Sequence, residues 1–512
     1  EKLNNHLQTP QEPSQIFHYF YTCNYQWKFK SMFFSLEKKD FWRMMFYRAL
    51  FEEKNITLAQ KIIPFLGKNI RPLLSNLDQL IEQSEPLKNE IYSFEDKETI
   101  LIDPEFDIEH ISLKINQVGK IFYQINSTKD SFIENSIKDE YWNDSQILEI
   151  YNELFSLTEK TGKYNFNLID FGKLLYLFLP KQIRNFIKNI KINRLDYIPY
   201  IYFILEDMII PFEMIYENNL FLLKYACGYK IGDISIPSLD FGEKISSNTR
   251  EMPPSLKKPN VLIIDSINAL NPKKWDENQK RKELIYPFKA GANELEYIIE
   301  YFSNSQKIDK ITILSGIKST RENILEYIKN SDIKLIHIVG NIFYSKWSPK
   351  DSYFLTNDNE IVKFKEIFDA IKENQKISKP FLFLNTQIYD MEGNKLKDTL
   401  KSFGEIISYF EFDSIMGIIC RSYPIFNDET KKLIAYFYDN LLDGTSQGVA
   451  LLKARQNIIA EETAKNIEKR IETMPENKVQ HINLKTSLVL SSYILFGKPW
   501  KTLNEIIRSK IF

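Results

Sequence analysis

The second half of the chain alternates between two hydrophobic patterns. Short runs of consecutive apolar residues predict buried strands, and longer stretches with an apolar residue at every third or fourth position predict helices. Strands are predicted at Val261–Ile264, Ile311–Leu314, Leu335–Val339, Phe381–Leu384 and Ile415–Ile419. Helices are predicted at Glu294–Phe302, Thr320–Ile328 with Ser319 as its N-cap, Lys397–Tyr409, Glu429–Leu442 and Gln447–Asn466. Because strands that alternate with helices form a mostly parallel sheet covered on both faces, the sequence predicts an α/β fold.

The first half is more varied. Residues 13–90 carry apolar residues at helical spacing, with Asn55 and Thr57 as candidate N-caps. Alternating apolar positions at Ile111–Ile115 and Lys120–Ile125 then predict a β-hairpin.

The chain of 512 residues is long enough for several domains at roughly 150 residues each. Helical spacing returns over residues 144–190, and a largely polar, proline-containing stretch from Pro237 to Pro259 predicts an exposed linker. We therefore expect an N-terminal helical region over residues 1–94, a β/α region over residues 95–250 and an α/β core over residues 259–512.

The charge balance is close to neutral. Lys and Arg number 67 against 68 Asp and Glu, which gives a formal net charge of −1. This composition carries no chain-wide footprint for nucleic acid or for an anionic membrane surface. Basic residues do recur at helical spacing from Lys181 to Arg194, which is typical of a solvated helix face, with nucleic-acid contact as the alternative.

Membrane, secreted and zinc-binding proteins are also disfavoured. The most apolar stretch, Tyr197 to Ile215, is interrupted by two prolines and three acidic residues, so it does not predict a membrane span. The first thirty residues lack the basic-then-apolar order of a secretory signal. The three cysteines, Cys23, Cys227 and Cys420, form no C-x-x-C pair. We expect a cytoplasmic protein in a reducing compartment.

Functional residues in open α/β sheets gather where the parallel strands end. The polar residues that follow predicted strands include Asp265, Ser266, Ser315, Asn341, Asn385, Thr386, Gln387, Cys420 and Arg421. None of these turns is a glycine-rich phosphate loop, and the chain has no H-E-x-x-H or Cys/His quartet, so we expect no cofactor and no metal. A G-x-S-x-G motif at Gly444–Gly448 lies between two predicted helices, whereas a nucleophile elbow needs a strand-to-helix turn, so a plain turn is predicted.

Several short motifs follow one another in a characteristic order. They are Ile210–Tyr216, Gly291–Ala292 with Glu294, Ser319–Thr320, Asp428–Thr430, Phe437–Tyr438, Gly444–Ser446, Ala450–Arg455 and Tyr493–Trp500. In this order they resemble the segments "iPwELL", "l-G-A-x-x-E" (with the Glu one place early), "A-T", "T…F-Y…G-x-s…A-L-x-x-A-R" and "f-x-x-x-G-d-P-w" of the CHAT family, the caspase-like cysteine peptidase domains related to separase, caspases and gingipains. The resemblance implies a caspase-like α/β sandwich with a mostly parallel central sheet, preceded by the N-terminal helical region.

Both catalytic elements of that family are present in altered form. The family's histidine ends a strand as "H-x-x-G-H", and the corresponding run His337–Asn341 puts Asn341 where the base belongs. The family's nucleophile strand reads "L-n-A-C", and the corresponding run Leu384–Gln387 puts Gln387 at the cysteine position.

This double replacement removes the chemistry of a cysteine peptidase. Such an enzyme needs a thiolate, with an imidazole beside it to form the thiolate and to protonate the leaving amine. Neither an Asn nor a Gln amide titrates near neutral pH or acts as a nucleophile. Since loss of a nucleophile or base costs on the order of 10⁶ in rate, the resemblance implies a pseudopeptidase that holds a peptide without cutting it.

The resemblance therefore predicts a regulatory or scaffolding subunit, with function in a prokaryotic defence or death pathway as the family-level analogy. Its partner is expected to be a protein or peptide, including a paralogue with an intact catalytic pair. The residues expected to contact a peptide are Asn341, Trp347, Asn385, Gln387 and Arg421. Trp347, Tyr353 and Phe354 are expected on one loop, where aromatic side chains serve either as loop anchors or as interface anchors.

Two alternatives stay open. The first is an active endopeptidase with Cys420 as a relocated nucleophile, although Cys420 is more typical of a small buried apolar residue. The second is a nucleic-acid or nucleotide sensor that uses residues 95–250, for which binding to an oligonucleotide would depend on salt.

Overall fold

The computed structural model describes residues 45–62, 108–141, 168–184, 200–231, 258–267, 289–471 and 490–503, with gaps inside these ranges. Most of the predicted helical region over residues 1–94 and most of the predicted linker from Pro237 to Pro259 lie outside the described residues.

The first half contains η1 (Arg48–Glu52), α4 (Ile56–Ile62), β1 (Ile108–Ile115), β2 (Lys120–Ser127), β3 (Ile133–Tyr141), α8 (Leu168–Phe178), β4 (Tyr200–Leu205), η3 (Phe212–Met214), β5 (Tyr216–Glu217), β6 (Asn219–Leu220), α10 (Phe221–Lys224) and β7 (Ala226–Ile231). The second half contains β8 (Asn260–Ser266), α11 (Lys289–Asn304), β9 (Lys310–Leu314), η5 (Gly316–Lys318), α12 (Arg321–Asn330), β10 (Leu335–Tyr344), η6 (Pro349–Asp351), β11 (Tyr353–Leu355), β12 (Ile361–Lys363), α13 (Phe364–Glu373), β13 (Phe381–Asp390), α14 (Thr399–Ser408), β14 (Gly417–Arg421), α15 (Asp428–Leu442), α16 (Gln447–Ile471) and β15 (Tyr493–Phe496).

Parallel strands form the centre of the second half. They lie side by side in the order β9-β8-β10-β13-β14, and β15 joins β14 in the antiparallel direction. This is a doubly wound order, and it reverses between β8 and β10. The mostly parallel, helix-covered sheet confirms the predicted α/β fold.

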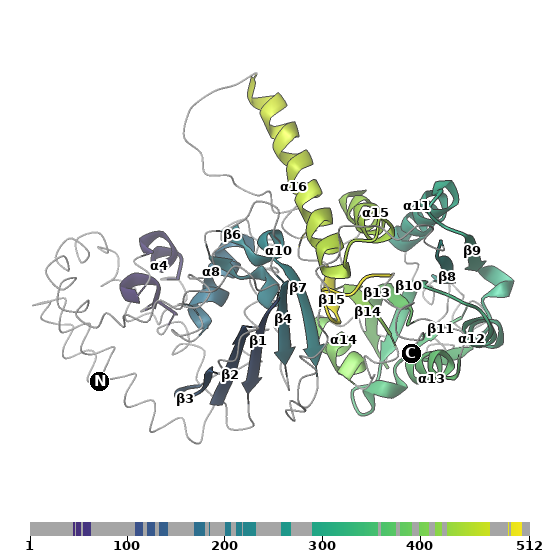
Figure 1. Ribbon diagram of the computed structural model, residues 1–512, viewed down its shortest axis with the longest axis horizontal. Helices are drawn as coiled ribbons and strands as arrows, with labels where there is room; N and C mark the ends of the chain where they lie inside the picture. Colours follow the sequence, from purple (N-terminus) through teal and green to yellow (C-terminus); the bar gives the residue numbers. More distant parts are fainter. Residues whose placement is uncertain are drawn as a thin grey trace, which may run out of the picture.

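The same sheet continues into the first half of the chain (Figure 1). On its other side β15 pairs with β7 in parallel, through Phe496 and Tyr229, and β7 is followed by β4 and β1. The predicted hairpin at Ile111–Ile115 and Lys120–Ile125 is present as β1 and β2, with β3 beside them. Strands of both predicted regions therefore share one sheet, and the C-terminal strand β15 joins them.

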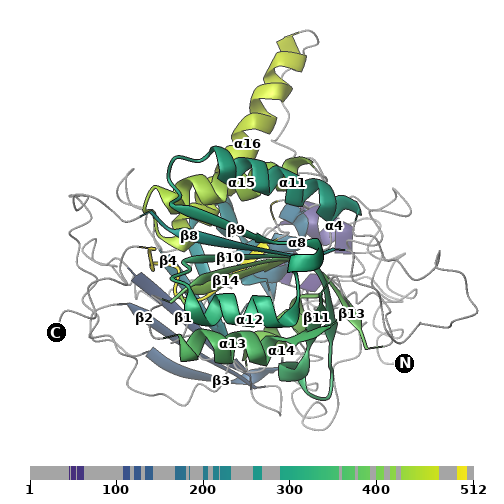
Figure 2. The same ribbon diagram turned by 90° about the vertical axis from the view of Figure 1, so that its right-hand side faces the viewer.

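Two layers of helices cover the parallel strands. Figure 2 shows α11, α15 and α16 above the sheet and α12, α13 and α14 below it. On the upper side the Phe437 ring lies 5.4 Å from that of Phe381 and 5.9 Å from that of Phe383. On the lower side α13 buries Phe364, Ile367 and Ile371 along one stripe at helical spacing.

Two strands are longer than predicted. β10 was expected to end at Val339 and β13 at Leu384, yet they run to Tyr344 and Asp390 and pair with each other along their whole length. The run of apolar residues ends at Val339 in β10 and at Leu384 in β13, but the backbone hydrogen bonding between the two strands continues past these residues. Asn341 and Gln387 therefore lie inside strands instead of in loops. A glycine is needed at position 340 beside β8, because a Cβ there would lie 2.6 Å from the Cβ of Ser266.

The helix starts and turns also differ in detail. The N-cap of α12 is Thr320, whose Oγ1 accepts a hydrogen bond from the Asn323 N–H at 3.2 Å, and the prediction of Ser319 is wrong by one residue. The Ser319 hydroxyl donates instead to the Asp265 carbonyl at 2.8 Å, across to β8. The G-x-S-x-G segment forms the predicted turn between α15 and α16, with Gly444 at φ 83°.

Candidate functional site

Asn341 and Gln387 are direct neighbours on adjacent strands. The register of β10 and β13 sets Asn341 opposite Gln387 and Val339 opposite Asn385. Because side chains alternate between the two faces of a strand, Asn341, Gln387 and Asn385 share one face of the sheet. The structure thus brings together three of the residues predicted for the site.

The two amides differ in their surroundings. Asn341 is only 2% exposed, and its Oδ1 accepts no hydrogen bond from any described residue. Gln387 is half-buried, and its Oε1 accepts a hydrogen bond from the Tyr389 hydroxyl at 2.6 Å. A buried carbonyl oxygen without a donor costs about 1–3 kcal/mol, so Asn341 carries an unsatisfied acceptor beside the half-buried Gln387.

Arg421, at the end of β14, is the centre of a buried polar cluster. Its guanidinium donates to both carboxylate oxygens of Glu294, at 2.9 and 2.7 Å, and to Asn385 Oδ1 at 2.5 Å. The Asn385 amide and the Thr430 hydroxyl donate to the same carboxylate, at 2.5 and 2.7 Å. The Tyr493 ring lies 5.0 Å from the guanidinium carbon. We call Glu294, Asn385, Arg421 and Thr430 the buried network.

A second buried ion pair connects the two halves of the sheet. Arg455 on α16 donates to Glu213 Oε1 at 2.7 Å and to the Tyr493 carbonyl at 2.6 Å. Burial raises the pKa of the Glu213 carboxyl, and the charge and hydrogen bond of Arg455 oppose this only in part. The pair therefore holds η3 and β15 together through α16.

The motif residues of the sequence contact one another in the structure. Glu294 meets Thr430, Glu213 meets Arg455, and His337 lies 2.8 Å from Tyr438 through its Nδ1 and the tyrosine hydroxyl. Sequence reasoning quoted Glu294 and Thr430 as parts of motifs without assigning them to the site. The only signal for them was that they occur in the same ordered set of motifs, since more than a hundred positions separate the two residues.

His337 is a core residue of β10. Its ring is fully buried and stacks on Phe383 with 5.0 Å between ring centres. Burial, with a smaller contribution from the charge of Arg421, lowers the pKa of His337 to about 3. The imidazole is therefore neutral at physiological pH, and it lies four positions before Asn341.

Cys420 is fully buried in β14. The register places it opposite Leu384, so it lies on the other face from Asn385 and Arg421. Burial, and to a smaller extent the charge of Glu213, raises the pKa of its thiol, which is therefore protonated near neutral pH. Cys227 in β7 is also buried with a raised thiol pKa, for which burial is again the main cause, and Cys23 lies outside the described residues.

The three predicted loop aromatics separate into two kinds. Trp347 is 95% exposed, whereas Tyr353 and Phe354 are buried in β11. The Tyr353 ring stacks on Phe343 of β10 at 5.3 Å between ring centres. Tyr353 and Phe354 thus anchor the hairpin to the sheet, and Trp347 alone projects into water.

The described part of the chain also bears on metal, membrane and nucleic-acid sites. Its residues contain no group of three or more His, Cys, Asp or Glu that would hold a metal ion. Its helices include none with the length and apolar character needed to cross a membrane. Of the basic run from Lys181 to Arg194 only Arg184 is described, and it is buried, with its guanidinium carbon 6.0 Å from the Tyr176 ring.

Comparison with known proteins gives similarity to solved structures alone. No protein-family model and no curated protein matches the sequence. The chain is similar to the arginine-specific cysteine proteinase gingipain R, at 12% identity and a TM-score of 0.34 over 64% of this chain and 68% of that chain. It is similar to a chain of the separase–securin complex of Saccharomyces cerevisiae, at 10% identity and a TM-score of 0.35 over 89% of this chain, which spans 34% of that one. A third structure, described only as a protease, has 8% identity and a TM-score of 0.33 over 70% and 76% of the two chains. Similarity of this size carries no information on activity.

Proposed function

We propose that the protein is a CHAT-like pseudopeptidase that binds a protein or peptide without cutting it. The observation that carries this proposal is the opposition of Asn341 and Gln387 on β10 and β13. These are the positions at which the sequence resemblance expects a catalytic histidine and a catalytic cysteine. Neighbouring strands would hold that pair within reach of each other, and here both members are amides.

The surroundings of the pair support a loss of catalysis. His337 is neutral and buried, and Cys420 is buried on the opposite face with a raised thiol pKa, mainly because of burial. A nucleophile must be a thiolate that the substrate can reach. Cys420 does not meet that requirement, and His337 is too buried to serve as its base, which weakens the alternative of a relocated nucleophile.

The residues proposed to bind a peptide divide into two groups. Asn385 and Arg421 are engaged with Glu294 and join the middle of β13 to the end of β14. Asn341, Gln387 and Trp347 are the proposed contacts, because the first has an unused acceptor, the second is half-buried and the third is exposed.

The biological role follows by analogy with the resembled family. A subunit that keeps a peptidase fold without its catalytic pair suits a regulatory or scaffolding role, with a catalytically intact paralogue as one candidate partner. A prokaryotic defence or death pathway is the setting that this analogy favours.

The test compares new protein N-termini in host lysate after addition of the full-length wild-type protein or its Cys420→Ala variant. We expect the same background of termini in both samples. Termini that require the wild-type protein and disappear with Cys420→Ala would overturn the proposal in favour of an active peptidase.

A restoration experiment tests the placement of the two amides. The Gln387→Cys variant and the Asn341→His/Gln387→Cys variant are alkylated with iodoacetamide over a range of pH. We expect the double variant to react at lower pH than the single one, because an imidazole beside the thiol favours the thiolate. Identical pH profiles would contradict the proposed pairing.

A further inference from the structure

The exposed large apolar side chains lie on segments that contact one another, since the Arg321 N–H donates to Glu360 and Lys363 pairs with Asp351. Among the described residues the large apolar side chains that are exposed are Ile317 at 94%, Trp347 at 95% and Ile361 at 42%. Ile317 follows the end of β9, Trp347 follows the end of β10, and Ile361 opens the edge strand β12. Single exposed apolar residues are ordinary, but several of them on contacting segments indicate an interaction surface.

The loop that carries Trp347 is held in place on both sides of the indole. Before it, the Ser345 N–H donates to Ser352 Oγ at 3.0 Å. After it, the Ser348 hydroxyl donates to Asp351 Oδ2 at 2.6 Å, and the short η6 helix follows. An exposed tryptophan on a loop of fixed geometry loses little conformational entropy when it binds, so it is suited to act as an anchor.

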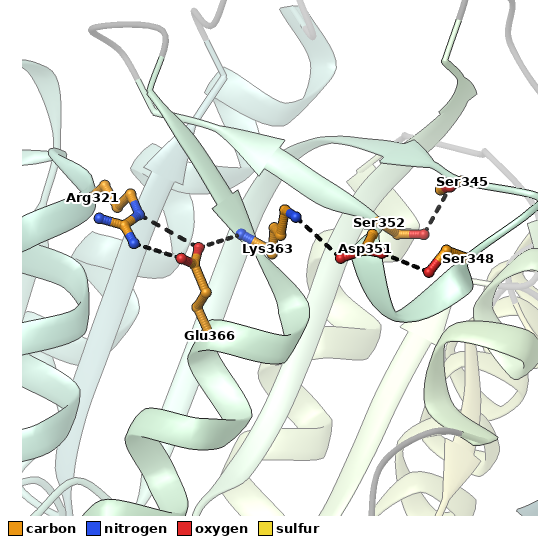
Figure 3. A network of polar contacts seen from close by, with 7 residues as sticks. All are labelled: Arg321, Ser345, Ser348, Asp351, Ser352, Lys363 and Glu366. Carbon is orange, nitrogen blue, oxygen red and sulfur yellow. Dashed lines mark hydrogen bonds and ion pairs between the residues drawn. The ribbon is translucent and has the colours of Figure 1, made fainter.

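The same network continues to the loop of Ile361 and to the start of α12 (Figure 3). Asp351 Oδ1 lies 3.1 Å from the Lys363 ammonium, and the Lys363 N–H donates to Glu366 at 3.0 Å. Glu366 in turn pairs with Arg321 at 2.5 Å, and the Arg321 N–H donates to Glu360, the residue before Ile361, at 2.9 Å. We call Arg321, Ser345, Ser348, Asp351, Ser352, Lys363 and Glu366 the surface network.

The strand register sets the distance between Ile361 and the loop of Trp347. Ile361 pairs with Leu355, and Phe354, the residue before Leu355, pairs with Ile342 in the antiparallel direction. Leu355, and with it Ile361, therefore lies at the level of Asn341. β10 continues three residues further, which is about 10 Å at 3.3 Å per residue. β12 also lies two strands to the side of β10, which adds about 10 Å across the sheet. An extended segment of about five residues is therefore long enough to reach from Ile361 to the end of β10, where the loop of Trp347 begins.

Exposed lysines lie next to two of the apolar anchors in the sequence. Lys346 and Lys350 flank Trp347, Lys318 follows Ile317, and all three are exposed. No ion pair within 4.0 Å joins these ammonium groups to a carboxylate of the described residues, and the charge of Lys350 acts on Asp351 without a direct contact. The nearby carboxylates of Asp351 and Glu366 are already paired with Lys363 and Arg321. The lysines are therefore available to an acidic partner.

We infer that Ile317, Trp347 and Ile361 form a docking surface for an extended acidic segment of a partner protein that places apolar side chains against them. This rests on the proposed function and names the chemistry of the partner. A protein segment fits better than a nucleic acid, because two aliphatic side chains beside a single indole do not provide stacking platforms for successive bases.

The test uses fluorescent twelve-residue peptides with a central Leu or Phe among Asp and Glu, and the same peptides with Asn and Gln in place of the acids. The wild-type chain should bind members of the acidic set and bind their amide counterparts at least about 10-fold more weakly. Trp347→Ala, and separately Lys346→Glu/Lys350→Glu, should each weaken binding by about 10-fold or more. The matched control Lys365→Glu/Lys372→Glu reverses two exposed lysines on α13 and should leave binding within about 2-fold.

Several outcomes would overturn the inference. They are the absence of binding by any acidic peptide, equal binding by the wild-type and Trp347→Ala proteins, and a Trp347-dependent preference for an oligothymidine or for phosphatidylserine vesicles. Because Trp347 is almost fully exposed, unchanged thermal unfolding of the Trp347→Ala variant will show that lost binding is not lost folding. The bound peptides are then examined by mass spectrometry. Cleaved peptides that bind through Trp347 would refute the pseudopeptidase but keep the docking surface, whereas intact, unbound peptides would refute only the docking surface.

Discussion

The buried network and the surface network use the same chemistry in opposite surroundings. Arg421 lies 2.7 Å from Glu294, and Arg321 lies 2.5 Å from Glu366, so the two ion pairs have similar lengths. The side chains of the first pair are both 1% exposed, whereas those of the second are 46% and 26% exposed. Contact distance therefore does not distinguish the two pairs, and exposure to water does.

Because of this difference in exposure, the two networks are expected to have different roles. Removing one member of a buried pair leaves an uncompensated charge out of water, whereas exposed pairs contribute little to stability because water solvates and screens them. The buried network is thus expected to stabilise the sheet beneath Asn341 and Gln387. The surface network is expected to position the loop of Trp347 and the strand of Ile361.

The largest expected effect is that of Arg421→Met. The substitution leaves the Glu294 carboxylate buried without a partner, and we expect the free energy of unfolding to fall by about 3–5 kcal/mol. Urea denaturation measures it. The double variant Glu294→Leu/Arg421→Met removes both charges and should recover a large part of the loss. If the single variant loses less than about 1 kcal/mol, the network does not stabilise the sheet.

The next largest effect is the dependence of the unfolding free energy on pH that His337 causes. In the unfolded chain this histidine takes up a proton below its ordinary pKa of 6.5, whereas in the folded protein its pKa is lowered to about 3. Protonation therefore favours unfolding, and stability falls as the pH drops from 6.5. Between pH 6.5 and pH 4 the loss should be roughly 3 kcal/mol.

A variant without the titrating group isolates this contribution. His337→Gln keeps a hydrogen-bond acceptor for Tyr438, and its unfolding free energy should fall less than that of the wild-type protein over the same pH range. Parallel pH profiles for the two proteins would show that His337 titrates normally in the fold. The surface network differs in its pH dependence. The pKa values of its carboxylates, Asp351 and Glu366, are lowered, so their contribution to stability is lost only at more acidic pH than that of His337.

The limits of the sequence follow from where the contacts lie. The strands of the second half were predictable because burial on both faces makes them continuous apolar runs, as in β8 and β10. The ends of β10 and β13 were not predictable from the sequence, because Asn341 and Gln387 interrupt the apolar runs while the backbone pairing continues. The helix α13 was missed because it begins directly after β12 with no turn residues between them.

The candidate site was predictable only in part. The resemblance pointed to Asn341 and Gln387, and the register makes them neighbours. The roles of Glu294 and Thr430 were not predictable, because Glu294 on α11 finds its partners Asn385, Arg421 and Thr430 on β13, β14 and α15, far away in sequence. A single sequence carries no signal for such long-range contacts.

Breaking the surface network should cost far less than breaking the buried one. Arg321→Ala removes the partner of Glu366 in a solvent-exposed pair, and we expect the free energy of unfolding to change by less than about 1 kcal/mol. The change should shrink further in 1 M sodium chloride, since salt screens exposed charges. Arg421→Met in the same salt should keep most of its effect. Equal salt sensitivity of the two variants would contradict the distinction between the networks.

The smallest effect concerns Asp351 and the loop of Trp347. The hydrogen bond from Ser348, followed by that from Lys363, lowers the pKa of the Asp351 carboxyl from its ordinary value of 3.8. The carboxylate therefore holds the loop at neutral and mildly acidic pH, and the loop should loosen only below pH 3.8. The difference in fluorescence anisotropy between the wild-type protein and its Trp347→Phe variant reports this indole alone. Ser348→Ala removes the main cause of the lowered pKa, so the loosening should move to higher pH, toward the ordinary range of a carboxyl. If Ser348→Ala leaves the transition in place, the hydrogen bond does not position the loop, and the indole is held by the backbone of the turn instead.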